Sequence, residues 1–233
     1  MEDSVPAAQG VTPLSKVKES LESLRVEDHP APIIDSSFAS PIQMFHNLVT
    51  LNVNACCNDG REGNCTFKLN DGNVSDLAMA LPRLETLFLG RPCSENTCPT
   101  TVACLLPISV HCVKLKVLKI HFNTTDVVRD FKGISEDPKF LELRLLPRCT
   151  LAGFGVGDTP LALDEFDVET VVKGMVDIFP SLRTCGGSGG TWGEVNRRIN
   201  ERVGNAVGEC CLALPFHLIH SEPDRGTQVM GTS

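Results

Sequence analysis

The chain has 233 residues, 42% of them hydrophobic, and carries a formal net charge of −8. This acidic balance argues against a nucleic acid or an anionic membrane as the main partner, because both attract clustered Lys and Arg side chains. The sequence contains no run of about 18 apolar residues, so we expect no membrane-spanning helix and no membrane partner.

The eleven cysteines do not indicate a secreted disulfide framework, because their number is odd. Residues 1–10 contain two acidic residues and lack the basic, apolar leader of a signal peptide. We therefore expect a cytoplasmic or nuclear protein with reduced thiols. Four cysteines stand where small buried residues are expected: Cys56, Cys112, Cys149 and Cys185.

Residues 1–39 are predicted to form an N-terminal segment that precedes the main domain. Residues 1–13 are polar and contain proline, which indicates a partly disordered lead. Residues 14–26 fit two structures. Leu14, Val17, Leu21 and Leu24 have helical spacing, whereas residues 21–26 also fit the strand pattern of a degenerate first repeat.

One short apolar pattern, L-x-x-L-x-L, recurs along the chain. Its anchor residues are Leu21, Leu48, Leu84, Leu115, Leu151 and Leu182. Successive anchors are 27, 36, 31, 36 and 31 residues apart, and such a recurrence is the signature of a solenoid. In each copy a strand points three apolar side chains inward. The ninth residue, Cys56 or Asn123 in two of the copies, is predicted to turn the chain and bind backbone groups there.

Helices are predicted between the anchors. Apolar residues at helical spacing lie within residues 41–46, 73–81, 102–106 and 167–179, with Asn73 as one cap and with Pro82, Pro107 and Pro180 as helix ends. Residues 131–147 fit either a helix or a strand. The alternation of strand, loop and helix predicts an α/β solenoid with a parallel inner sheet, outer helices and about five repeats.

These stretches resemble the leucine-rich-repeat domain of fungal F-box-type proteins. The resemblance rests on FHNLVTL at 45–51, LPRLETL at 81–87, CVKLKVL at 112–118, FPSLR at 179–183 and a Gly-rich turn before a Trp-containing helix at 186–199. It implies a leucine-rich-repeat domain over residues 40–190. The T-x-x-E capping box at 191–194 and the apolar stripe that follows it predict a capping helix over 191–205, and loop composition predicts a tail over 206–233. The resemblance also implies a substrate receptor of a cullin-type ubiquitin ligase. The F-box that would bind the ligase adaptor is not found in residues 1–40.

The candidate binding residues follow from the strand pattern. The third and fifth positions of each copy point away from the core, and the seventh position extends the same side. We expect these side chains to contact a protein partner: Thr50, Asn52, Thr86, Phe88, Val117, Lys119 and His121. An exposed Phe88 beside Lys119 and His121 is the predicted centre of the contact.

The sequence matches catalytic and cofactor-binding motifs only weakly. The glycine-rich stretches at 153–157 and 186–190 lack the Lys-Ser/Thr of a phosphate loop. The cysteines and histidines at 56–65 and 210–220 lack paired zinc-ligand spacing. We therefore predict a non-enzymatic interaction protein without a cofactor or metal. Two alternatives stay open: a metal- or nucleotide-dependent enzyme, and a truncated gene product without a partner.

Overall fold

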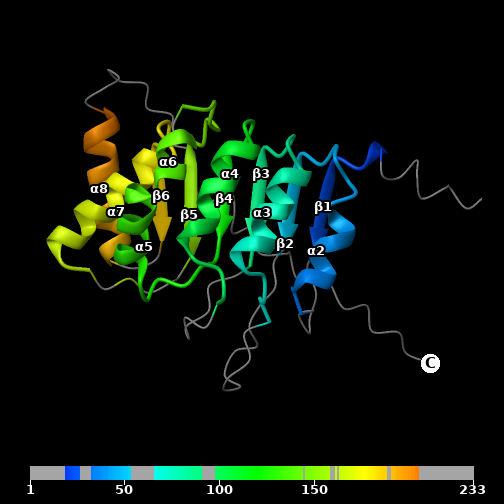
Figure 1. The fold of residues 1–233 in the computed structure, drawn as a ribbon, viewed down its shortest axis with the longest axis horizontal. Coiled ribbons are helices and arrows are strands. Elements are labelled where there is room, and N and C mark those ends of the chain that lie inside the picture. The colour runs from blue at the N-terminus through cyan, green and yellow to red at the C-terminus, as the bar shows by residue number, and fades with distance from the viewer. Residues whose placement is uncertain are drawn as a thin grey trace, which may run out of the picture.

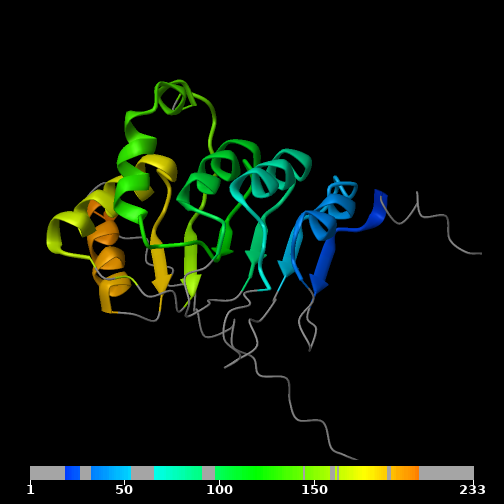
Figure 2. The same cartoon turned by 60° about the horizontal axis from the view of Figure 1, so that its bottom comes forward.

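The computed structural model describes residues 19–26, 33–53, 66–90, 98–143, 145–157, 161, 163–187 and 190–204. These residues form a six-stranded parallel sheet in which the strands follow one another in sequence order. Helices lie in a row along one face of this sheet (Figures 1 and 2). The predicted α/β architecture, a parallel sheet with helices on its outside, is confirmed.

The strands coincide with the sequence repeat. They are β1 (Ser23–Val26), β2 (Thr50–Val53), β3 (Thr86–Leu89), β4 (Val117–Ile120), β5 (Gly153–Gly157) and β6 (Thr184–Gly187). The first residues of all six strands are paired across the sheet, and each lies two residues after an anchor leucine. Residues 21–26 therefore contribute a strand, and the sheet has six strands where about five repeats were predicted.

The helices connect the strands. They are α2 (Ser36–Ile42), α3 (Asp71–Ala80), the 3-10 helix η1 (Val102–Cys104), α4 (Leu105–His111), α5 (Val127–Glu136), α6 (Pro138–Leu143), α7 (Glu165–Ile178) and α8 (Gly190–Gly204). The two sequence patterns that fitted residues 131–147 resolve into helix, in α5 and α6. The predicted domain boundary at residue 40 falls inside α2, because β1 and α2 already belong to the repeated layers.

Two predicted helix ends are wrong. The cap of α3 is Asn70, whose side chain accepts from the Asn73 backbone N–H at 2.9 Å, so the predicted cap Asn73 lies within the helix. Pro107 does not end a helix, because it occupies the first turn of α4. A proline is tolerated there, since the first N–H groups of a helix have no partner inside it.

The core lies between the sheet and the helix row. The anchor leucines Leu48, Leu84 and Leu115 and the second and fourth residues of β2, β3 and β4 are all buried. The apolar stripe predicted for residues 167–179 forms the inner face of α7. Of the four cysteines predicted to be buried, Cys112, Cys149 and Cys185 are buried free thiols, and Cys56 lies outside the described residues.

A second set of hydrogen bonds joins the segments that enter the helices. Ile34 forms a parallel bridge with Phe67, and the Ile34 N–H donates to the Thr66 carbonyl at 2.8 Å. The Thr100 hydroxyl donates to the Leu69 carbonyl at 2.5 Å, and the Thr100 carbonyl accepts from the Asn123 N–H at 2.8 Å. The first four units are therefore tied at the sheet and again at the segments that lead into α2, α3, η1 and α5.

Helix α8 covers the β6 end of the sheet (Figure 1). Its Trp192, Val195 and Ile199 side chains are buried. The Asn196 side-chain oxygen accepts from the Cys185 backbone N–H at 2.8 Å, which satisfies a donor on the terminal strand. A predicted terminal helix thus covers the last open part of the core.

Replacing Leu118 by Ala should lower the free energy of unfolding by about 2–5 kcal/mol, because a fully buried side chain leaves a cavity. Leu145→Ala is the matched control, since the Leu145 side chain is 87% exposed and should change stability by less than about 0.5 kcal/mol. Urea unfolding measures both. Equal losses in the two variants would contradict the assigned core.

Two helical glycines should respond in opposite directions to alanine. A Cβ at Gly174 would lie 2.3 Å from Phe131 Cδ1, so Gly174→Ala should cost about 1–3 kcal/mol through overpacking between α5 and α7. A Cβ at Gly133 meets nothing within 4 Å, so Gly133→Ala should add about 0.5–1 kcal/mol through helix propensity. Thermal unfolding followed by circular dichroism distinguishes them, and a stabilising Gly174→Ala would refute the packing of α5 on α7.

Candidate functional site

The face of the sheet opposite the helices carries the predicted binding residues. In β2, β3 and β4 buried residues alternate with half-buried ones. The half-buried side chains are Thr50, Asn52, Thr86, Phe88, Val117 and Lys119. No described helix covers this side of the strands (Figure 2). We call it the open face. The six residues lie on this side of the strands, and Phe88, which was predicted to be exposed, is half-buried. Their contact with a partner stays a prediction.

The strand register arranges the open face in two rows. The first row is Ser23, Thr50, Thr86, Val117, Gly153 and Thr184. The second row is Arg25, Asn52, Phe88, Lys119, Gly155 and Gly186. Neighbouring strands are about 4.8 Å apart, so residues of one row are regularly spaced across the sheet. The register converts positions about thirty residues apart in sequence into adjacent surface groups.

The side chains on the open face differ in size. A Cβ built on Gly155 would lie 3.4 Å from Lys119 Cγ, so the aliphatic stem of Lys119 lies close over the Gly155 backbone. Gly153 and Gly186 also lack side chains. Gly153 and Gly155 are themselves buried, so β5 does not form an exposed floor on this side.

Two cationic side chains lie in the two rows, Arg25 and Lys119, and the other row members are uncharged. Both take part in further interactions, so neither is an unpaired charge. Just outside the rows, Lys116 pairs with Glu85 at 2.6 Å.

Asn52 has an unsatisfied polar atom. Its side-chain oxygen is buried and accepts no hydrogen bond from any described residue. Such an atom costs free energy unless a donor reaches it. The residue opposite Asn52 on β3 is Phe88, so this acceptor lies beside the largest apolar group of the face.

The prediction that His121 is an exposed binding residue is wrong, because only 2% of its surface is exposed. Strand β4 ends at Ile120, so the alternation of sides stops before this residue. The imidazole lies edge-on to the Phe67 ring, with centroids 6.5 Å apart, and next to Gly90, whose φ is +78°. Loss of hydration lowers the pKa of His121 to about 4. In the sequence, Gly90 could have indicated this burial, because a residue without a side chain leaves room for a neighbouring imidazole.

Of the two predicted turn residues, Asn123 lies within the described part of the chain. The Asn123 side-chain oxygen accepts from the Thr125 N–H at 2.8 Å, which closes a local turn before α5. Contact with the neighbouring unit comes from the Asn123 backbone, through its bond to Thr100. Cys56 lies outside the described residues.

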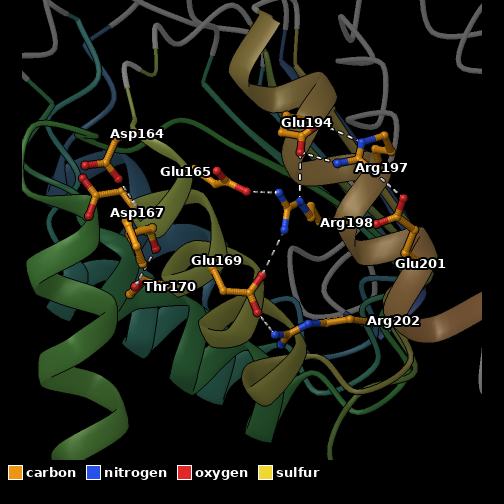
Figure 3. A network of polar contacts seen from close by, with 11 residues as sticks. Asp164, Glu165, Asp167, Glu169, Thr170, Glu194, Arg197, Arg198, Glu201 and Arg202 are labelled. Carbon is orange, nitrogen blue, oxygen red and sulfur yellow. Dashed lines mark hydrogen bonds and ion pairs between the residues drawn. The ribbon is translucent and has the colours of Figure 1, made fainter.

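A second candidate, which the sequence analysis did not identify, is a cleft of about 450 Å³ between α7 and α8. Figure 3 shows that Arg198 lies among carboxylates of both helices; it bonds Glu194 at 2.9 Å and Glu165 at 3.0 Å. Hydrogen bonds from Arg197 and Arg198 lower the pKa of Glu194 to about 2. Arg202 likewise pairs with Glu169. These charges satisfy one another. The ion pairs between Glu165 and Arg198 and between Glu169 and Arg202 therefore form a strap that holds α8 on α7. In the sequence, the i, i+3 and i, i+4 spacing of Glu194, Arg197 and Arg198 could have predicted the ion pairs within α8.

Within the part of the chain that the structure describes, no group of three or more His, Cys, Asp or Glu side chains is placed to hold a metal ion. The cysteines and histidines at 210–220 lie outside that part. None of the described helices is long and apolar enough to cross a membrane.

No protein-family model matches the sequence, and no curated protein is significantly similar to it. The function therefore has to be argued from the geometry of the open face.

Burial of His121 predicts a pH dependence of stability. Its pKa is lowered from 6.5 to about 4 in the folded protein, so the unfolded chain binds the proton more readily. The stabilising contribution is present above pH 6.5 and is lost as the pH falls towards 4, a change of about 3 kcal/mol. Urea unfolding at pH 7 and pH 4 should show a smaller loss in His121→Gln than in the wild type. His111→Gln, at an exposed position, should retain the wild-type loss, and equal losses in all three proteins would contradict the assignment.

Proposed function

We propose that this chain is a protein-recognition module of the leucine-rich-repeat type and that its open face binds a partner protein. The observation that carries the proposal is the register that aligns six candidate side chains on one sheet face, which no helix of the described residues covers. In such a module one side of each strand builds the core and the other side is left for recognition. The proposed role is binding without catalysis, and it requires no cofactor.

Rigidity supports this role. The strands are joined by continuous parallel pairing, and the segments that precede the helices are joined again through Ile34, Thr66 and Thr100. Side chains on such a frame lose little conformational freedom when a partner binds. A larger share of the contact energy is then retained as affinity.

Phe88 is the proposed anchor of the contact. It is half-buried on the third of six strands, between Asn52 and Lys119 in the second row. Aromatic residues near the centre of an interface, with polar neighbours around them, account for much of the binding energy in many complexes. The hydroxyls of Thr50 and Thr86 and the apolar Val117 extend the surface in the first row.

The finer proposal is that the module is the substrate-recognition part of an F-box-type ubiquitin ligase receptor in the cytoplasm or nucleus. It rests on the resemblance of the repeat stretches at 45–51, 81–87, 112–118 and 179–183. Binding of the ligase adaptor is not part of the proposal, since no F-box stretch was recognised in residues 1–40.

Affinity capture from an extract of the native cells tests the proposed function. The immobilised wild-type chain should retain specific proteins that Phe88→Ala loses, as measured by quantitative mass spectrometry. Phe166→Ala is the matched control, because Phe166 is 86% exposed on α7 and removes the same side chain from the helix side. Circular dichroism should show that both variants remain folded. Ligase subunits among the captured proteins would support the finer proposal. Identical retention by wild type and Phe88→Ala, or retention of nothing, would refute recognition by the open face.

A further inference from the structure

The residues at which the chain enters the strands form an edge of the sheet beside the open face. The Lys116 N–H donates to the Glu85 carbonyl at 2.9 Å. The Ala152 N–H donates to the Lys116 carbonyl at 3.0 Å, and the Arg183 N–H donates to the Ala152 carbonyl at 3.1 Å. These four residues directly precede β3, β4, β5 and β6. They are therefore neighbours in space, at intervals of about 4.8 Å from one unit to the next.

This edge is cationic over the last four units. We call it the cationic edge and define it by the residues one and three positions before each strand: Arg83, Glu85, Lys114, Lys116, Thr150, Ala152, Ser181 and Arg183. It holds four cations and one carboxylate, on a chain whose net charge is −8. Towards β1 the same backbone ladder continues through Val49 to Glu22, so the excess of positive charge ends at β3.

Two cations of the edge are not neutralised. Lys116 is paired with Glu85 at 2.6 Å. Lys114 and Arg183 are exposed, and neither side chain forms a hydrogen bond or an ion pair with another residue that the structure describes. The hydrogen bond from Lys116, together with the charges of Lys116 and Lys114, lowers the pKa of Glu85. The potential at this part of the surface is therefore positive.

Ala152 lies between cations of the two neighbouring units. Lys114 and Lys116 precede the strand on one side of it, and Arg183 precedes the strand on the other. Two strand spacings put the Cα atoms of Lys116 and Arg183 about 9.6 Å apart. Ala152 brings no charge and no side-chain hydrogen-bonding group of its own. An anionic group at Ala152 is therefore within reach of long cationic side chains from both sides.

The extent of the edge favours a short acidic segment of a protein over a long polyanion. Three strand spacings separate β3 from β6, which is about 14 Å. About four residues of an extended chain, at about 3.4 Å each, cover this length. A nucleic acid would continue past the edge and meet an otherwise acidic chain. Carboxylates of a short segment instead receive charge-assisted hydrogen bonds from Lys and Arg.

We propose that the cationic edge binds an acidic segment of about four residues in a partner protein, with one carboxylate held at Ala152 between Lys114 and Arg183. This inference rests on the proposed function for the nature of the partner. It adds a second contact to the module, because the residues of the edge directly precede the first row of the open face. The contact does not involve Phe88.

Titration with synthetic peptides tests the inference. The probe is a fluorescein-labelled peptide with the core Asp-Glu-Asp-Glu and Gly-Ser flanks, followed by fluorescence anisotropy at low salt. The control peptide has the core Asn-Gln-Asn-Gln, which keeps the size of the side chains and removes their charge. We expect saturable binding of the acidic peptide and binding of the control that is about tenfold weaker or more. Equal affinities, or no binding of the acidic peptide, would overturn the inference.

A matched pair of variants tests the position of the carboxylate. Ala152→Glu places a carboxylate of the chain itself among the cations, so it should weaken binding of the acidic peptide about tenfold or more. Ala152→Gln introduces a side chain of nearly the same size without the charge, and it should bind the peptide about fivefold more tightly than Ala152→Glu or better. Circular dichroism should show that both variants are folded. Equal affinities of the two variants would overturn the placement at Ala152.

Charge reversal separates the edge from the net charge of the chain. Arg183→Glu and Lys114→Glu should each weaken binding about fivefold or more, because a like charge then faces the acidic segment. Lys132→Glu makes the same charge change at an exposed position on α5, on the helix side, and should retain the wild-type affinity. Equal weakening in all three variants would attribute binding to net charge alone and overturn the site.

Failure of this inference can be distinguished from failure of the proposed function. If the acidic peptide does not bind, while cell proteins are captured in a manner that depends on Phe88, recognition by the open face stands and the acidic-segment assignment is refuted. If the peptide binds in a manner that depends on Arg183, while no captured protein depends on Phe88, the edge contact stands and recognition by the open face is refuted. If neither dependence is observed, both are refuted.

Discussion

The structure depends on the burial of one apolar layer between the parallel sheet and the helix row. Leu51, Leu87 and Leu118 lie side by side in this layer and are almost inaccessible to solvent. Burial of one side of each strand makes the register specific, because a shift by one residue would turn every apolar side chain to the open face. The sheet order, the helix row and the two surface rows all follow from that constraint.

The same constraint sets the arrangement of the open face. The core uses one set of alternate residues, and the other set lies half-buried on the opposite side of the strands. Backbone pairing places Arg25, Asn52, Phe88 and Lys119 in one row across the sheet. Their Cα spacing is therefore set by the spacing of the strands.

The β6 end of the sheet is closed in a different way. Apolar packing by Trp192 is supplemented by the Asn196 bond to the last strand and by ion pairs that join α8 to α7. Those ion pairs are largely exposed, so each contributes little by itself. The Trp192 indole is fully buried and packs closely against Gly187, so it removes a large apolar surface from water.

The sequence alone determined the architecture. Anchor leucines at intervals of 27 to 36 residues predicted the strands, their alternation predicted which side chains leave the core, and the 3.6-residue period of 167–179 predicted α7. The sequence was less informative about the ends of helices. Asn70 and Asn73 are both suitable caps for α3, and only the folded structure shows that Asn70 is the cap. The sequence also failed at His121, because a strand pattern does not show where the strand ends.

Only the tertiary structure decided which groups meet. The pairing of Arg25, Asn52, Phe88 and Lys119 in one row, the unsatisfied oxygen of Asn52 and the charges shared by α7 and α8 join residues from separate units. Periodicity reports the side on which a residue lies within its own unit, because it is a local property of the chain. The distance between units is set by strand pairing and loop length, and these act only in the folded protein.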